Sequence, residues 1–289
     1  MTEIAGKVAL VTGGGSGIGR GIVLAAADEG ASVVVVDLLL DRAEEVAAEV
    51  EKAGGTAVAL ACDVSKRDDV KQMKAAANEA LGEVGLLFAN AGVTWFDRLT
   101  DMKDEDVDWV IHVNLMGSLY CVQEFLPDMI SAGDGHVCAT ASNAGLIPGW
   151  VPFHTPYSIS KAGMIAMMMN LRQELEGTGV GSTVYCPGGV RGRIAESYAH
   201  RPEQFGGPID QPLNIDPEWS RNNIIGFFFA EEVGPWVMQA VRENRPMVVD
   251  HANQRKHFFD WYVNHAVTAF DEAEAWEASL PRLQAEAAQ

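Results

Sequence analysis

The sequence predicts an α/β fold in which about seven parallel strands form one sheet with helices on both faces. Three observations support this prediction. Short apolar runs alternate with stretches of helical periodicity, as in repeated βαβ units. These runs are apolar throughout, as expected for strands that helices cover on both sides. The 289 residues are 48% hydrophobic and include 29 glycines, which suits a packed globular protein.

Seven apolar runs are expected to form the strands: Val8–Thr12, Ser32–Val36, Thr56–Ala61, Leu86–Ala89, His136–Thr140, Ser182–Cys186 and Met247–Val249. Between them, apolar residues such as Ala43 and Val46 recur at helical spacing. Long helices are expected over Asp104–Ile130 and Tyr157–Glu176, and another over Glu231–Arg242.

The prolines indicate where this regular pattern is interrupted. Eight of the twelve fall within 148–156 and 187–217, which excludes ordinary helix interior or central strand there. Long irregular segments in compact domains are commonly functional loops. We therefore expect residues 1–289 to form a single domain, with a substrate loop at 190–226 and a C-terminal tail at 251–289.

Composition excludes several classes of function. The formal net charge of −19 and the lack of a basic stripe argue against a nucleic-acid partner. No apolar run approaches the roughly 18–20 residues that span a bilayer, and no targeting signal is recognisable. The four cysteines are scattered, with no metal-ligand spacing. We expect buried, inert thiols, no metal site, no membrane contact and a cytoplasmic protein.

A glycine-rich turn, Thr12 to Gly19, follows the first strand and opens the first helix. Such a turn lets the backbone approach a pyrophosphate, which the free N–H groups of the helix N-terminus stabilise. Methyltransferases and flavoproteins use similar turns, so those classes stay open at this point. The residues expected to contact a bound dinucleotide are Gly13, Ser16, Gly17, Ile18 and Gly19.

Asp37 ends the second strand, where a carboxylate can bind both hydroxyls of an adenosine ribose and would repel a 2′-phosphate. No arginine or lysine stands in the glycine turn before Arg20 or directly after Asp37. The sequence therefore favours NAD over NADP as the cofactor.

Tyr157 and Lys161 are four residues apart on an expected helix, so they share one face. A nearby cation favours the phenolate and would lower a tyrosine pKa that is otherwise near 10, which suits a general acid/base. Taken alone, the pair fits an exposed aromatic–lysine pair at least as well. Its position after Ser142 and the nucleotide turn favours a catalytic role.

Together these motifs resemble the short-chain dehydrogenase/reductase family, in its compact one-domain form, from about Gly6 to Val249. The matching stretches are Thr12 to Gly19, Cys62-Asp63-Val64, Asn90-Ala91-Gly92, Asn114, Ser142, Tyr157, Lys161 and Pro187-Gly188 with Val190. The resemblance implies a Rossmann-type doubly wound sheet. It also implies that Asp63, Val64, Asn90, Ala91, Gly92, Tyr157, Lys161, Pro187, Gly188 and Val190 contact the cofactor.

The resemblance further implies a catalytic tetrad of Asn114, Ser142, Tyr157 and Lys161. In alcohol oxidation Tyr157 would take the hydroxyl proton, Ser142 would hold the substrate oxygen, and Lys161 would tune the phenol and bind the nicotinamide ribose. The backbone carbonyl of Asn114 would hold a proton-relaying water. One departure is that Arg191-Gly192 follows Val190, where the family often has a threonine that binds the carboxamide.

Aromatic residues near these motifs indicate the substrate class. The candidate substrate contacts are Trp95, Asn143, Trp150, Phe153 and Tyr198. They suit a bulky hydrophobic or aromatic alcohol or ketone, although each aromatic could instead close a loop or pack between subunits. The segment 187–208 is similar to a branch of the family that oxidises benzylic alcohols of lignin-derived aryl ethers. His154 is interpreted as a satisfied or exposed loop histidine rather than a second acid/base group.

The tail contains Phe258, Phe259, Trp261, Tyr262, Phe270 and Trp276, so part of it is expected to pack on this or a neighbouring subunit. The resemblance implies a homodimer or homotetramer formed through the helices of Asn114 and Tyr157. The leading hypothesis is an NAD-dependent alcohol dehydrogenase or carbonyl reductase. The alternatives are a catalytically silent nucleotide-binding regulator or scaffold, and a methyltransferase.

Overall fold

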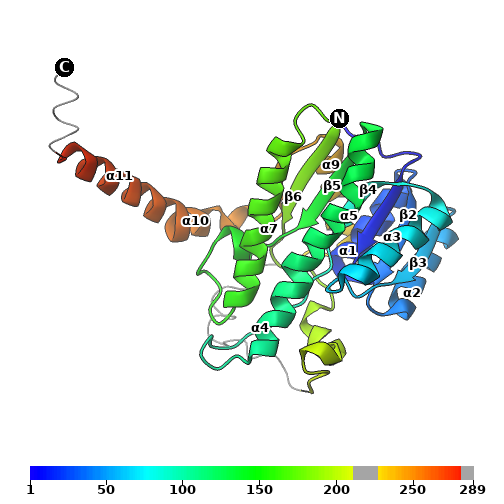
Figure 1. Cartoon of the computed structure of the whole chain (residues 1–289), viewed down its shortest axis with the longest axis horizontal. Helices are drawn as coiled ribbons and strands as arrows, with labels where there is room; N and C mark the ends of the chain where they lie inside the picture. The colour runs from blue at the N-terminus through cyan, green and yellow to red at the C-terminus, as the bar shows by residue number, and fades with distance from the viewer. Residues whose placement is uncertain (211–226, 281–289) are drawn as a thin grey trace.

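A seven-stranded parallel sheet forms the centre of the molecule (Figure 1). The structure is a computed structural model that describes residues 1–210 and 227–280. The sheet order is β3–β2–β1–β4–β5–β6–β7, and the strands are β1 Val8–Thr12, β2 Ser32–Asp37, β3 Ala57–Ala61, β4 Val84–Ala89, β5 Gly135–Thr140, β6 Val180–Cys186 and β7 Met247–Val249. The predicted fold class and all seven predicted strands are confirmed, with ends that differ by two residues at most.

Helices cover both faces of the sheet. Their bounds are α1 Gly17–Asp28, α2 Leu40–Lys52, α3 Arg67–Leu81, α4 Asp104–Ile111, α5 Gly117–Ala132, α6 Asn143–Leu146, α7 Thr155–Glu174, α9 Ala230–Arg242, α10 Arg255–Phe258 and α11 Asn264–Ala278. Apolar residues of α1, α2 and α9 pack on one face, and those of α3, α5 and α7 pack on the other. The long helix predicted over 104–130 is interrupted by a π-helical turn at His112–Met116.

Residues 190–210 form an irregular segment with two 3-10 turns, η2 Ile194–His200 and η3 Glu203–Phe205. Arg201 holds this segment against α4 through a buried ion pair with Asp106. The Arg201 guanidinium also lies over the Trp109 ring, 5.3 Å from its centroid. The predicted substrate loop at 190–226 lies partly outside the described residues, and the single-domain organisation stays a prediction.

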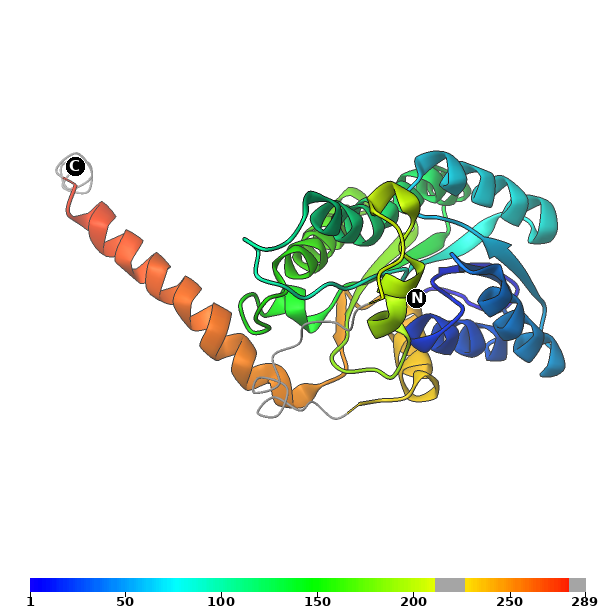
Figure 2. The same ribbon diagram turned by 90° about the horizontal axis from the view of Figure 1, so that it is seen from below.

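The chain beyond β7 is buried against the rest of the molecule at first and then projects into solvent. His251 and Gln254 are buried, whereas the helical stretch from Arg255 to Ala278 projects away from the body (Figures 1 and 2). Near its start, the ring of His257 stacks on that of Trp150, with centroids 5.6 Å apart. Trp261 also lies close to the body, since a Cβ added at Gly149 would be 4.0 Å from its Cε3 atom. Packing of the tail aromatics on their own subunit is therefore limited to the root of this helical stretch. The last predicted tail residues, 281–289, lie outside the described residues.

Candidate active site

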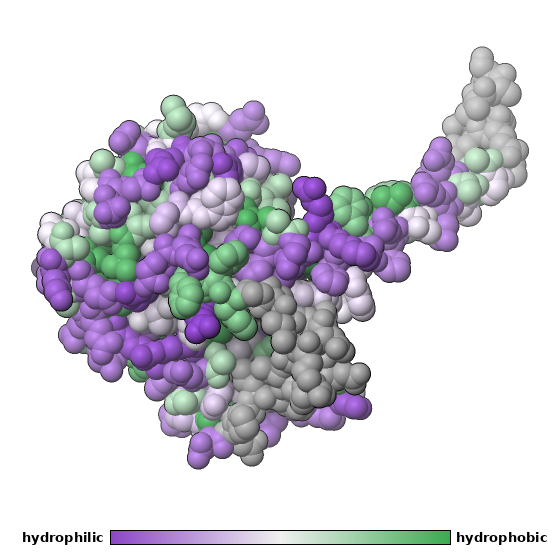
Figure 3. Space-filling view, turned by 180° about the vertical axis from the view of Figure 1, so that it is seen from behind, coloured by the Kyte–Doolittle hydropathy of each residue, from purple (hydrophilic) through white to green (hydrophobic). Residues whose placement is uncertain are grey.

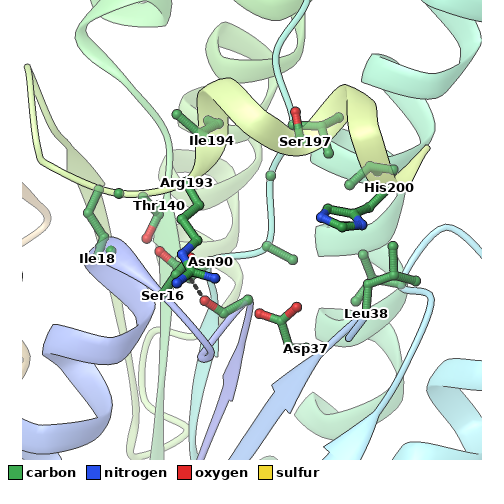
Figure 4. Close-up of a pocket in the computed structure, with 18 of the residues that line it drawn as sticks. Ser16, Ile18, Asp37, Leu38, Asn90, Thr140, Arg193, Ile194, Ser197 and His200 are labelled. Atoms are coloured by element: carbon green, nitrogen blue, oxygen red, sulfur yellow. Dashed lines mark hydrogen bonds between the residues drawn. The ribbon is translucent and has the colours of Figure 1, made fainter. Parts of the chain in front are cut away.

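A pocket lies at the carboxyl ends of the central strands, which is where doubly wound sheets bind ligands (Figure 4). Short connections after these strands bring its lining residues together. Gly13 follows β1, Asp37 ends β2, Asn90 follows β4, Ser142 follows β5 and Pro187 follows β6. The pocket is therefore a direct consequence of the parallel topology.

Of the predicted cofactor contacts, all but Gly19 line this pocket. They are Gly13, Ser16, Gly17, Ile18, Asp37, Asp63, Val64, Asn90, Ala91, Gly92, Tyr157, Lys161, Pro187, Gly188 and Val190. Gly19 has a packing role instead, because a Cβ added there would lie 2.1 Å from the carbonyl oxygen of Gly13. Its hydrogen lets α1 begin directly behind the turn, so that the helix N-terminus faces the pocket. This arrangement fits a dinucleotide pyrophosphate.

Asp37 is fixed in the pocket by backbone donors. Its Oδ2 accepts a hydrogen bond from the N–H of Gly15 at 3.1 Å, and its Oδ1 accepts one from the N–H of Leu39 at 3.2 Å. The carboxylate therefore keeps one orientation at the end of β2, beside the glycine turn, as a ribose-binding carboxylate requires.

Sequence reasoning missed Arg42, which also lines the pocket. The sequence argument considered only the residue directly after Asp37. Arg42 comes five residues later, and the first turn of α2 places its side chain beside Asp37 in the pocket. The Arg42 guanidinium donates a hydrogen bond to Nε2 of His200 at 3.1 Å, and His200 points into the pocket from the irregular segment (Figure 4). Arg193 points into the pocket from the same segment (Figure 4).

Tyr157 and Lys161 lie one turn apart on α7, and both are buried. The Lys161 ammonium lies 5.7 Å from the centroid of the Tyr157 ring and donates a hydrogen bond to the carbonyl oxygen of Thr140 at 2.8 Å. Ser142 caps the short helix α6, where its Oγ accepts a hydrogen bond from the N–H of Ala144 at 3.1 Å. The structure therefore brings three of the four tetrad residues together at the pocket.

The protonation states of Tyr157 and Lys161 differ from those expected from the sequence. Burial raises the pKa of Tyr157 to about 12, although a hydrogen bond with the Ser142 hydroxyl acts in the opposite direction. Burial also lowers the pKa of Lys161 to about 7. The expectation that the lysine lowers the pKa of Tyr157 is therefore wrong for this structure. The reason is that desolvation of the phenol is the main cause of the shift, and Lys161 is itself only partly charged near neutral pH.

Asn114, the fourth tetrad residue, lies behind the pocket wall in the π-helical turn. Its side-chain amide donates hydrogen bonds to the carbonyl of Val93 at 3.0 Å and to Oγ of Ser160 at 3.1 Å, and its Oδ1 accepts one from the N–H of Val93 at 2.8 Å. Its own backbone carbonyl accepts a hydrogen bond from the Ser118 hydroxyl at 2.8 Å. The side chain thus ties the loop after β4 to α7.

His154 lies against the tyrosine. Its ring stacks between those of Phe96 and Tyr157, with centroid separations of 3.9 Å and 4.2 Å and interplanar angles of 11° and 6°. Its Nε2 shares a hydrogen bond with Oγ1 of Thr94 at 2.7 Å, and burial lowers the pKa of the imidazole to about 3. The ring is therefore buried and neutral and not exposed, but it is only partly satisfied, because its Nδ1 is buried without a hydrogen-bond partner among the described residues. Apart from the spacing of three residues between His154 and Tyr157, nothing in the sequence predicts that the two rings stack.

The predicted substrate contacts are not part of the pocket lining described above. Asn143 donates a hydrogen bond to Gln254, Trp150 packs on His257, and Phe153 is partly exposed. Trp95 and Tyr198 pack against the core that α3, α5 and α7 form with the sheet. From the irregular segment, the lining residues are instead Val190, Arg191, Gly192, Arg193, Ile194, Ser197, His200 and Pro202.

A metal site and a membrane span were both expected to be absent, and residues 1–210 and 227–280 bear on these expectations. Within these ranges no group of three or more histidine, cysteine, aspartate or glutamate residues is placed to hold a metal ion. Nor is any helix there long and apolar enough to cross a membrane. All four cysteines are free and buried, as predicted.

In this doubly wound sheet, one pocket contains the glycine turn, the acidic end of β2 and the buried tyrosine–lysine pair. This combination defines a dinucleotide-binding oxidoreductase. Residues 7–203 match the sequence model of the family described as short chain dehydrogenase, and the chain belongs to that family. It is accordingly an enzyme that acts on CH–OH or carbonyl groups.

Curated relatives and solved structures agree with this assignment. The chain is 34% identical over 201 residues to the oxidoreductase UcpA of Salmonella typhimurium, covering 70% of this chain and 76% of that one. It is 33% identical over 208 residues to a C alpha-dehydrogenase of a Sphingobium species, covering 71% and 68%. A short chain dehydrogenase/reductase from Burkholderia phymatum, solved in complex with NAD, superposes with a TM-score of 0.82 at 31% identity, covering 89% and 93%.

Buried Lys161 leads to a prediction about stability. Its pKa of about 7 in the folded protein is below the value near 10.4 expected for an unfolded chain, so between these values the unfolded state binds more protons. The penalty for burying the lysine is therefore largest at and below pH 7 and disappears as pH approaches 10. Lys161→Met should raise the free energy of unfolding near pH 7, with an advantage that shrinks by at most about 1.4 kcal/mol per pH unit above it.

Urea unfolding of both proteins at pH 6.5, 8 and 9.5 measures this difference. Lys52→Met, at an exposed position of α2, is the control and should show no difference that depends on pH. An advantage of Lys161→Met that grows with pH would contradict the buried, partly neutral lysine.

Proposed function

We propose that this enzyme transfers hydride between NAD and a secondary alcohol or ketone that is bulky and hydrophobic or aromatic. The observation that carries the proposal is that Tyr157, Lys161 and Ser142 line the same pocket as the glycine turn and Asp37. A proton-transfer group and a nucleotide site are then adjacent, as hydride transfer to or from a carbinol carbon requires.

The pocket residues suit NAD. The N-terminus of α1 would hold the pyrophosphate, Asp37 the adenosine ribose, and Asn90 to Gly92 with Pro187 and Gly188 the nicotinamide half. The nicotinamide ring, when bound, supplies the hydride acceptor or donor. Asp37 favours NAD by its charge, whereas the nearby Arg42 is already hydrogen-bonded to His200. The NAD complex of the Burkholderia phymatum relative supports this choice.

Tyr157 would move the proton and Ser142 would hold the substrate oxygen. With its pKa raised to about 12, Tyr157 is a neutral phenol at physiological pH and can donate its proton to a carbonyl oxygen as hydride reaches the carbonyl carbon. In the reverse direction the phenolate form of Tyr157 takes the proton of the alcohol, so oxidation requires that the phenol first lose its proton to solvent. Lys161, held by the Thr140 carbonyl, would bind the nicotinamide ribose and supply positive charge beside the phenol.

An aromatic substrate is supported by the surroundings of Tyr157. The rings of Phe96 and His154 stack behind Tyr157, outside the pocket lining, and Val93 and Ile194 supply aliphatic surface within the pocket. The C alpha-dehydrogenase of Sphingobium is among the relatives. We also propose a cytoplasmic homodimer or homotetramer. No observation favours a silent regulator, and membership of the family argues against a methyltransferase.

The test of reaction and substrate class is turnover on a panel of alcohols, followed by NADH absorbance. We expect benzylic and other bulky secondary alcohols to give higher kcat/KM than small aliphatic ones. Tyr157→Phe should lower kcat by about 100-fold or more, the usual contribution of a general acid/base, while NAD affinity changes little. Tyr120→Phe on α5 is the control and should retain activity. Retention of more than a tenth of the activity in Tyr157→Phe would refute the proton-transfer role.

Cofactor choice gives a separate prediction. The unmodified enzyme should have a higher kcat/KM with NAD than with NADP, because the carboxylate of Asp37 repels a 2′-phosphate. Asp37→Ala should lower the ratio of kcat/KM with NAD to kcat/KM with NADP by about tenfold. The reason is that Arg42 then remains as the charged group nearest the 2′-phosphate. Asp41→Ala, at an exposed position of α2, is the matched control and should leave the ratio unchanged. Equal use of both cofactors by the unmodified enzyme would contradict the NAD preference.

A further inference from the structure

The helical stretch Arg255–Ala278, here called the arm, exposes large apolar side chains that a lone subunit would leave in water. It consists of α10, the π-helical turn Phe259–Val263 and α11, and beyond its root, where His257 and Trp261 contact the body, it stands clear of the body (Figures 1 and 2). Phe270 and Trp276 are 76% and 61% exposed. The other exposed large apolar residues of the arm are Phe259, Trp261, Tyr262 and Val267. Exposed apolar surface on this scale indicates an interaction site.

Several of these side chains lie on one side of the arm, whereas Trp261 lies near Gly149 of the body. Tyr262, Ala266 and Phe270 follow each other at intervals of four residues, so they lie on one helical face. Val263, Val267 and Ala273 flank them, whereas Asn264 and Thr268 fall on the opposite face. In Figure 3 apolar residues gather along one side of the arm and polar residues along the other. The small side chain of Ala266 at the middle of this face permits close approach of a second helix.

Charge is distributed unequally along the arm. Arg255 and Lys256 stand at its root, where Lys256 is ion-paired with Asp260 of the same arm. Four acidic residues stand near its tip: Asp271, Glu272, Glu274 and Glu277. Two arms side by side in the same direction would bring like charges together. In opposite directions, each basic root meets an acidic tip. Four acids at the tip also disfavour an anionic membrane surface, which attracts basic amphipathic helices.

We propose that the arm is a self-association surface that pairs antiparallel with the arm of a second copy of this chain. The twofold axis passes near Ala266, and each Tyr262 then faces Phe270 of the second copy. The same register sets Arg255 opposite Glu277, and Lys256 within reach of Glu274. Such a pair is isologous, so each arm is occupied by the arm of one other copy. It is independent of the proposed enzymatic reaction.

Disulfide formation tests the geometry directly in the full-length chain. All four native cysteines are buried, so an added surface cysteine is the accessible thiol. Ala266→Cys lies on the proposed axis and should give a covalent dimer under mild oxidation. Thr268→Cys, two residues away on the opposite face, is the matched control and should stay largely uncrosslinked. The proposal fails if Ala266→Cys crosslinks no faster than Thr268→Cys, as it would if the arm packed on the body of a second copy or bound another protein.

Charge reversal tests the antiparallel direction. In the Ala266→Cys background, Arg255→Glu with Lys256→Glu should slow crosslinking at low salt, and so should Glu274→Lys with Glu277→Lys. An equimolar mixture of these two variants restores opposite charges at both ends of the pair, so it should crosslink several-fold faster than either variant alone. A mixture no faster than its components would overturn the antiparallel arrangement. NAD turnover of the unpaired variants should be retained, which separates this result from any failure of the proposed function.

Discussion

Burial of the Lys161 ammonium at the carboxyl edge of the sheet is the constraint on which the site depends. A buried charge is costly unless it is hydrogen-bonded, and the carbonyl of Thr140 at the end of β5 provides the acceptor. That carbonyl is available because parallel strands end at a common edge and leave their last groups unpaired there. The same edge carries Asp37 and Asn90, so the topology that stabilises the lysine also assembles the nucleotide site.

Desolvation then determines the chemistry of the neighbouring tyrosine. Tyr157 is enclosed by the stacked ring of neutral His154 on one side and by Ser142 on another, so its phenol stays protonated in the folded protein. The burial that raises its pKa also lowers that of Lys161. An additional positive charge in the pocket would lower the pKa of Tyr157 and so favour loss of its proton. A cationic nicotinamide bound beside the phenol would supply such a charge.

The sequence was sufficient for the parts of the molecule that local patterns determine. Runs such as Val33–Val36 consist of β-branched residues, which favour a buried strand, and the glycine turn is recognisable because only glycine allows its close approaches. The path of residues 190–210 was not predictable, because the Arg201–Asp106 ion pair joins positions 95 residues apart. His200 was missed for the same reason, whereas Arg42 was missed because only the residue directly after Asp37 was considered. The aromatic residues chosen as substrate contacts lie outside the pocket lining: Trp95 and Tyr198 pack against the core, Trp150 stacks on His257 and Phe153 is exposed.

The segment 250–254 joins the loop after β5 to the loop after β6, two regions that are far apart in the sequence. Oδ1 of Asp250 accepts a hydrogen bond from the N–H of Gly188 at 2.8 Å, and its Oδ2 accepts one from the Tyr185 hydroxyl at 2.6 Å. Gln254 then accepts a hydrogen bond from Asn143, the residue after Ser142. The segment 250–254 therefore supports both loops that flank the proposed nicotinamide position, while the arm begins only at Arg255. Because the arm continues directly from these buried residues, its root has a fixed place on the body. A pairing of two arms would consequently orient both pockets relative to one twofold axis.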